Sequence, residues 1–329
     1  MSLNPSLTSE VDLLSSYRSN DASVALAKIR IVHLSDLHIV SHPFLKRIDK
    51  VQGVRGHDPD ILPALQRETR LLKPDLLIVS GDQTTWGDKT SLQFARNFIQ
   101  ELAKEIQISQ QQICWIPGNH DVLLDYYLGD RFSPRNHEIV FGETPSCRCL
   151  NVAGYHIGLF PFDSTLDPKK LHIALRPWVG SKGRVSSLSF NNFNESTNTP
   201  AVAQCSFKIA VVHHHPLPIP FKGGGQNVGI ELTTMSNGGT FIAHMQESGI
   251  NLVLHGHEHH SYSCRYSFDP DRPDIVIVAA GSASQRGAHE NSFNYLEIVP
   301  DERIVVRKYL YTEAGFRRDA VKIFAIERS

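Results

Sequence analysis

Five short polar segments each follow directly after a run of apolar, largely β-branched residues. Apolar runs of this length predict buried strands, and open α/β sheets bind ligands beyond the carboxyl ends of their strands. The segments offer carboxylates, imidazoles and one amide, which are ligands of hard and borderline divalent metals. The five segments are Asp36-Leu37-His38, Gly81-Asp82, Gly118-Asn119-His120-Asp121, His213-His214-His215-Pro216 and Gly256-His257-Glu258-His259.

The first part of the chain alternates between predicted strands and predicted helices. Strands are expected over 29–35, 76–80 and 113–116, with helices over 60–72 and 90–106. This order is typical of a parallel sheet covered by helices. We therefore expect an α/β fold whose strand ends share one rim.

The remainder of the chain predicts a large sheet content. Strands are expected over 155–160, 207–212 and 251–254, followed by an antiparallel meander over 274–280, 293–299 and 304–310. The stretch 181–200 is rich in Ser and Asn, which predicts a surface loop or insertion. We expect a lead-in segment over 1–27 and a single domain over 28–329.

Composition narrows the class of protein. The formal net charge of −1 provides no global basic field for nucleic acid. Residues 1–27 lack the features of a signal peptide, and no apolar run has the ~20 residues of a membrane span. The five cysteines are predicted to be ordinary reduced thiols, since Cys147-Arg148-Cys149 has no matching second pair. These features predict a cytoplasmic protein without a membrane partner.

The five segments and their strands resemble the calcineurin-like metallophosphoesterase superfamily over roughly residues 29–300. The resemblance implies a four-layer αββα sandwich of two mixed β-sheets flanked by helices. It also implies a dinuclear centre of two transition-metal ions, for which Fe, Mn, Zn and Co all suit the mixed N and O ligands. The predicted activity is hydrolysis of a phosphoester by a hydroxide formed at this centre.

Ligand roles transfer from the resemblance residue by residue. The first metal would be held by Asp36, His38, Asp82 and His259, and the second by Asp82, Asn119, His213 and His257. Asp82 would bridge the two ions. His214, two residues before Pro216, is an alternative to His213.

Further roles are predicted for residues beside the ligands. By the resemblance, His120 would act on the phosphoryl or leaving-group oxygen, with Asp121 orienting its ring. His33 lies within the first strand and is predicted to be a core histidine. His215 and His255 are interpreted either as residues supporting the ligands or as polar surface.

Two features indicate the branch of the superfamily: one segment resembles a particular branch, and another differs from the protein Ser/Thr phosphatases. The run from His213 to Pro216 is closest to the cyclic-nucleotide phosphodiesterase-like branch. Trp86-Gly87 stands where the protein Ser/Thr phosphatases carry Arg-Gly. We therefore predict a small phosphodiester substrate, such as a cyclic nucleotide.

The sequence leaves three alternative functions. A nuclease would need a basic or aromatic groove, which the net charge disfavours. A phosphomonoesterase of the same superfamily and a non-enzymatic binding scaffold are the remaining alternatives, although a scaffold would be expected to lack some ligands. Specificity is expected in the loops 42–59, 123–149, 166–203 and 218–239. The glycine run 223–225 in the last of these is interpreted either as a flexible lid or as a loose connection.

Overall fold

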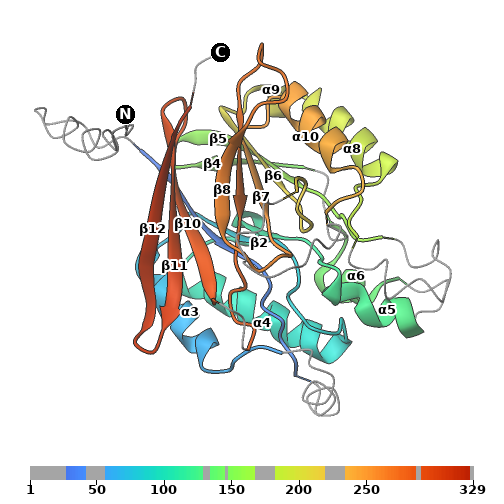
Figure 1. Ribbon diagram of the computed structural model, residues 1–329, viewed down its shortest axis with the longest axis vertical. Coiled ribbons are helices and arrows are strands. Elements are labelled where there is room, and N and C mark those ends of the chain that lie inside the picture. The colour runs from blue at the N-terminus through green and yellow to red at the C-terminus, as the bar shows by residue number, and fades with distance from the viewer. Residues whose placement is uncertain are drawn as a thin grey trace, which may run out of the picture.

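The structure is a computed structural model that describes residues 27–41, 56–128, 134–144, 147–166, 182–218, 234–286 and 290–326. Two β-sheets occupy its centre, with helices on the outer face of each (Figure 1). The strands of the first sheet are β1 (Ile29–Leu34), β2 (Leu76–Val79), β3 (Ile113–Trp115), β10 (Ser292–Val299), β11 (Arg303–Thr312) and β12 (Gly315–Ala325). The strands of the second sheet are β4 (Arg148–Val152), β5 (Tyr155–Pro161), β6 (Phe207–Val211), β7 (Leu252–His255), β8 (Tyr262–Tyr266) and β9 (Ile275–Ala279).

Both sheets are mixed, with parallel strands at the positions that lead to the predicted site. The first sheet has the order β12-β11-β10-β1-β2-β3 and the second the order β4-β5-β6-β7-β9-β8. Strands β1, β2 and β3 are parallel neighbours, as are β5, β6, β7 and β9. The carboxyl ends of parallel neighbours lie at one edge, so each sheet brings several strand ends together.

Side chains cap the first turns of α4, α8 and α9. For example, Asp88 accepts a hydrogen bond from the Ser91 N–H at the start of α4. The α-helices are α3 (Ile61–Leu72), α4 (Lys89–Glu105), α5 (Leu123–Leu128), α6 (Asn136–Phe141), α8 (Ser187–Thr197), α9 (Pro200–Ala203) and α10 (Gly238–Glu247). Two short 3₁₀ helices are η1 (Gln110–Gln112) and η2 (His120–Val122).

Three apolar clusters define four layers. Side chains alternate across each strand, so Ile31 of β1 enters the cluster between the two sheets while Val32 faces the cluster under α3 and α4. On the second sheet, Ile209 of β6 faces the other sheet and Ala210 faces the cluster beneath α8, α9 and α10. The predicted four-layer αββα sandwich is therefore confirmed.

Two predictions about the elements are wrong. The stretch 181–200 is no simple loop, because it contains α8, where the Ser186 side chain caps the first turn and Phe193 is buried against the second sheet. Strand β9 does not join the predicted meander; it lies in the second sheet between β7 and β8. The meander is instead β10, β11 and β12, and the last of these, like β4 and β8, was not predicted from periodicity.

Some predictions fall on parts of the chain beyond the description. The lead-in segment 1–27 lies outside the described residues except for residue 27, and the run 223–225 lies wholly outside them. Within the described residues, no helix combines the length and apolar character needed to cross a membrane.

Candidate metal centre

All five polar segments meet at one place, at the carboxyl ends of strands from both sheets. The first sheet contributes the residues that follow β1, β2 and β3, and the second contributes those that follow β6 and β7. The predicted histidine and aspartate ligands fall into overlapping groups whose ligand atoms lie within 4.8 Å of one another. These groups are Asp36–His38–His259, His38–Asp82–His120 and Asp82–His213–His257.

One side of the cluster joins the end of β1 to the segment after β7. His259 Nε2 lies 3.2 Å from Asp36 Oδ1 and 3.1 Å from His38 Nε2. The backbone N–H of His257 donates to Asp36 Oδ2 at 3.1 Å. Residues more than 200 positions apart in sequence are thereby held in contact.

The other side joins β2, β3 and β6. His213 Nε2 lies 3.4 Å from Asp82 Oδ2, 3.1 Å from Asn119 Oδ1 and 3.3 Å from His257 Nδ1. Asp82 stands between the two sides, since the same Oδ2 is 3.9 Å from His38 Nε2. This position suits a carboxylate shared by two cations.

The candidate ligands fit metal ions because lone pairs of their nitrogen and oxygen atoms face one another, with too few protons between them to form hydrogen bonds. His213 Nδ1 lies 2.7 Å from the Ser80 carbonyl oxygen, which can only accept, so Nδ1 carries the proton. In the neutral ring, Nε2 therefore directs a lone pair at the oxygens of Asp82 and Asn119. Among the residues that the structure describes, the buried Nε2 of His257 has no hydrogen-bond partner. A cation would satisfy these atoms together.

The charges of the cluster act on one another strongly. Burial tends to raise the pKa of Asp82, but His213 and His120 outweigh it and hold that pKa well below its usual range. Burial tends to lower the pKa of His213, yet the Asp82 carboxylate raises it to about 9. The site thus favours ionised carboxylates beside a positive charge, which a metal ion would supply in place of a proton.

Backbone strain is concentrated at the candidate ligands. Positive φ angles occur at Asp36 (54°), His38 (49°), Asp82 (50°), His257 (80°) and His259 (56°). Residues other than glycine uncommonly adopt this left-handed conformation, although aspartate and histidine do so more often than most, and it costs on the order of 1–3 kcal/mol per residue. Such strain persists where the surrounding structure imposes it, and it is typical of functional sites.

Two glycines make the close approach possible. A Cβ on Gly81, whose φ is +102°, would lie 2.3 Å from His213 Nδ1. A Cβ on Gly118 would lie 2.1 Å from Asp82 Oδ1. Both distances are far below contact, so a side chain at either position would displace a candidate ligand.

His120 lies at the edge of the cluster with one ring nitrogen already engaged. Its Nδ1 is 2.9 Å from the Thr85 carbonyl oxygen, which fixes the proton on Nδ1 and leaves Nε2 for another partner. Its backbone N–H donates to Asp82 Oδ1 at 2.8 Å. Thr85 also donates its hydroxyl to the His38 carbonyl at 2.9 Å, so one residue supports both histidines.

The ring of His120 has the Thr85 carbonyl as its hydrogen-bond partner, and the role of orienting that ring stays a prediction for Asp121. The buried carboxylate of Asp121 joins the loops after β2 and β3. Burial and the neighbouring Asp82 carboxylate raise the pKa of Asp121 to about 7, against the effect of its backbone donors. It accepts hydrogen bonds from the backbone N–H groups of Gln83, Thr84 and Gly118 and from the Thr84 hydroxyl.

The triple histidine divides into different environments. His213 points into the cluster, whereas His214 Nδ1 pairs with the Ser164 hydroxyl at 2.8 Å. His215 is buried and its Nε2 lies 3.0 Å from the Thr234 hydroxyl. Geometry thus favours His213 over His214 as a ligand.

Two other histidines are buried away from the ligand groups. His33 is a core histidine as predicted, with Nε2 2.9 Å from the Ser80 hydroxyl, and burial lowers its pKa to about 3. His255 is also buried, so the surface interpretation is wrong for it; its Nε2 is 2.8 Å from the Tyr262 hydroxyl.

The supporting partners were missed by sequence reasoning. The Ser80 and Thr85 carbonyls belong to the backbone, so no residue type signals them. Arg135, which contacts Asp163 and the Thr165 hydroxyl, links the start of α6 to the segment after β5.

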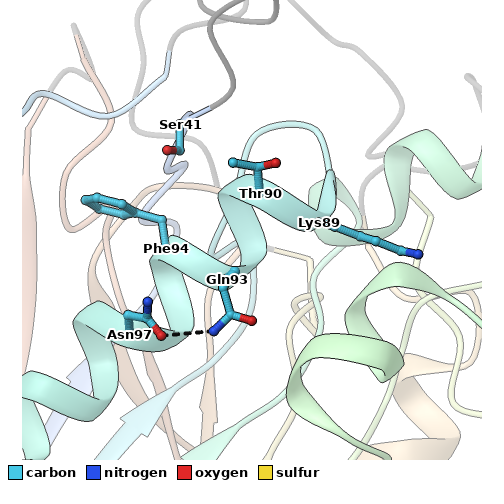
Figure 2. Close-up of a pocket in the computed structure, with 6 residues that line it drawn as sticks. All are labelled: Ser41, Lys89, Thr90, Gln93, Phe94 and Asn97. Carbon is cyan, nitrogen blue, oxygen red and sulfur yellow. Dashed lines mark hydrogen bonds between the residues drawn. The ribbon is translucent and has the colours of Figure 1, made fainter.

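A shallow hollow lies along the first half of α4. Figure 2 shows Gln93 donating to Asn97 there, with Phe94 and Lys89 on the same helix. None of the candidate ligands lines this hollow, so we assign it no part in the metal centre. Its lining residues are Ser41, Lys89, Thr90, Gln93, Phe94 and Asn97.

The fold and the cluster together define a sandwich protein of the phosphoesterase class. The family model for calcineurin-like phosphoesterases matches residues 29–261, more than half of the chain, and the chain belongs to this family. The resemblance on which the predicted phosphoester hydrolase depends is therefore confirmed. A search among curated proteins finds no match.

Solved structures share the fold at low sequence identity. Purple acid phosphatase PPD1 from yellow lupin (Lupinus luteus) superposes with a TM-score of 0.52 at 9% identity, covering 91% of this chain and 54% of the lupin chain. GAP50, the anchor in the inner membrane complex of Plasmodium, gives 0.51 at 11% identity, covering 92% of this chain and 90% of its own. This chain thus spans about half the length of the lupin phosphatase, and the likeness shows the fold alone.

Proposed function

We propose that this protein is a metal-dependent phosphodiesterase that hydrolyses a small phosphodiester, with cyclic nucleotides as the first candidates. The observation that carries the proposal is the position of Asp82, which lies within ligand distance of His38 on one side and of His213 and His257 on the other. The first group is Asp36, His38, Asp82 and His259, and the second is Asp82, Asn119, His213 and His257. We assign one transition-metal ion to each group.

The chemistry of such a pair is general. Two bound divalent ions would hold phosphate oxygens, lower the pKa of a water molecule toward neutrality and balance charge in an in-line displacement. The protein's part is to fix the ligands before substrate arrives. The buried carboxylates, the Ser80 carbonyl behind His213 and the left-handed backbone all serve this purpose.

His120 is proposed to act on the substrate and not to serve as a main ligand. Its Nδ1 proton is committed to the Thr85 carbonyl, so Nε2 is the atom available to the substrate. When protonated, Nε2 would donate to a phosphoryl or leaving-group oxygen and stabilise charge that develops there. Asp121 is proposed to position this residue indirectly, through the loops it joins.

The proposed preference for a diester rests on two features of the sequence. Trp86-Gly87 replaces the Arg-Gly of the protein phosphatases, and the net charge of −1 gives no field for a long polyanion. A diester presents one anionic charge to the metal pair and two substituents to the surrounding loops. The described parts of the loops predicted for specificity include α5, α6, α8 and α9.

The test is a comparison of catalytic efficiency on bis(p-nitrophenyl) phosphate, p-nitrophenyl phosphate and cyclic AMP. Protein loaded separately with Mn, Fe, Zn and Co should hydrolyse the diesters more efficiently than the monoester with at least one metal. Asp82→Asn serves as the inactive control. A preference for the monoester with no diester turnover under any metal would refute the proposed substrate class while leaving the metal centre intact.

A further inference from the structure

The tertiary fold brings together three thiols that the sequence separates. Cys149 lies on β4, directly opposite Gly158 of β5. A Cβ on Gly158 would lie 3.5 Å from Cys205 Sγ, so the space left by this glycine is bordered by the Cys205 thiol. Opposed residues of an antiparallel pair project from the same face, which places the Cys149 and Cys205 side chains beside each other.

The third thiol belongs to the same face of the sheet. Cys147 stands two residues before Cys149 and packs against the apolar cluster beneath α8, α9 and α10. Cys149 is exposed, whereas Cys147 and Cys205 are partly buried. The exposed thiol therefore lies between two partners and is the one that a dissolved reagent reaches first.

The titration behaviour agrees with this contact. Burial, together with hydrogen bonding and repulsion from Cys149, raises the pKa of the Cys205 thiol to about 11. Burial and the same neighbour raise the pKa of Cys147 to about 12. The raised pKa values of Cys205 and Cys147 both have Cys149 among their causes, which agrees with contact among the three side chains.

We propose that Cys149 and Cys205 form a reversible disulfide by exchange with low-molecular-weight disulfides such as oxidised glutathione. Cys205 is favoured over Cys147 because two residues along a strand are separated by about 6.6–6.8 Å, the upper limit of Cα separation for an unstrained disulfide. Cys205 comes from the segment between α9 and β6, and its thiol reaches Gly158, the residue opposite Cys149, beside the Phe160 ring.

The exchange takes two balanced steps. Cys149 loses its proton to solvent, and its thiolate attacks one sulfur of glutathione disulfide, forming a mixed disulfide and releasing one glutathione thiolate. Cys205 then loses its proton and attacks the Cys149 sulfur, breaking the mixed disulfide and releasing the second glutathione. Two protein thiols are oxidised, and one small disulfide is reduced to two thiols.

The new bond would tie the edge strand β4 to the segment that leads into β6. It lies on the outer face of the second sheet, since Cys147 packs against the helix-side cluster and not against the cluster between the sheets. The site is therefore separate from the candidate metal centre, and its test does not depend on the proposed activity.

The experiment is incubation of the full-length protein with oxidised glutathione, followed by thiol counting under denaturing conditions and non-reducing peptide mapping. Of the five cysteines, two should be lost to give three free thiols, with a Cys149–Cys205 linkage that dithiothreitol reverses. Cys205→Ser should stop the reaction at a glutathione adduct on Cys149, and Cys149→Ser should abolish both products.

Cys264→Ser is the matched control, because Cys264 lies on β8 at the opposite edge of the same sheet. This variant should form the linkage as the wild type does. A Cys147–Cys149 bond, a linkage between two chains, a soft metal held by the three thiols after purification, or five thiols remaining after incubation would each overturn the proposal.

Discussion

The rim of strand ends and the layer between the two sheets are built on opposite principles. Between the sheets, side chains such as Phe207 and Ile209 alternate regularly along straight strands and are fully apolar. At the rim, buried carboxylates and imidazoles stand on left-handed backbone, as at Asp82 and His38. The core supplies stability through burial, and the rim uses part of that stability to hold charged groups in strained positions.

The largest effect at the rim is expected from removing the Asp82 carboxylate, which the two proposed metal ions share. Asp82→Ala should lower bound metal from about two ions per chain to less than one and reduce turnover by about 10³-fold or more, because the metal pair is worth several kcal/mol in the transition state. Elemental analysis and steady-state kinetics measure both effects. The control is Asp75→Asn: Asp75 lies at the other end of β2 and contacts Arg30, so this variant should bind as much metal as the wild type.

Removing His120 should separate catalysis from metal binding within the rim. His120→Ala should reduce turnover by roughly 10²–10⁴-fold, the usual contribution of a positioned acid or base, while most of the metal remains bound. The exposed His156 on β5 provides the control, since His156→Ala should leave both quantities unchanged. An empty site or normal turnover in the His120 variant would contradict the proposed role.

A cavity between the sheets should affect stability without touching the candidate ligands. Phe207 is 1% exposed, and Phe207→Ala should lower the free energy of unfolding by about 3–5 kcal/mol. Phe268 is 59% exposed, so Phe268→Ala should change it by less than about 0.5 kcal/mol. Denaturant titration of both variants makes the comparison, and equal effects would show that this layer is not the main core.

A fall in pH should lower the free energy of unfolding, because histidines buried in the packed regions are neutral and resist protonation. His137 on α6 is buried against Phe141, and burial lowers its pKa to about 3 from an ordinary value near 6.5. The unfolded chain therefore binds a proton that the folded chain refuses, so stability present above pH 6.5 is lost as the pH falls toward 3. At pH 5 this group should cost about 2 kcal/mol. His137→Gln should reduce the difference in unfolding free energy between pH 7 and 5 by that amount.

The smallest expected effect tests the strain at the rim directly. His259 has a φ of 56°, which glycine adopts freely and alanine does not. In metal-free protein, His259→Gly should be more stable than His259→Ala by about 1 kcal/mol, although glycine gains entropy in the unfolded chain. Both variants lose the same side chain, so thermal unfolding isolates the backbone term. Equal stability, or a more stable alanine variant, would argue against strain at this position.

The sequence alone determined the chemistry of the site and the main elements of the fold. Apolar runs marked β1, β2, β3 and β6 because buried strands leave a local periodic signal, and the polar segments followed those strands in the chain itself. Long helices with a regular spacing of apolar residues, such as α4, were predicted in the same way. The residue types that a metal requires could be read in order, and so could the family to which they belong.

Only the tertiary structure decided relations that depend on distant residues. Helix α8 is rich in Ser and Asn, and its position on the second sheet depends on burial of Phe193, which no local propensity reports. The Nδ1 atoms of His120 and His213 contact backbone carbonyls, which have no residue signature. The Cys205 thiol approaches Cys149 only because β5 lies between their segments and carries a glycine where they meet. Local sequence encodes which groups are present, and packing decides which of them meet.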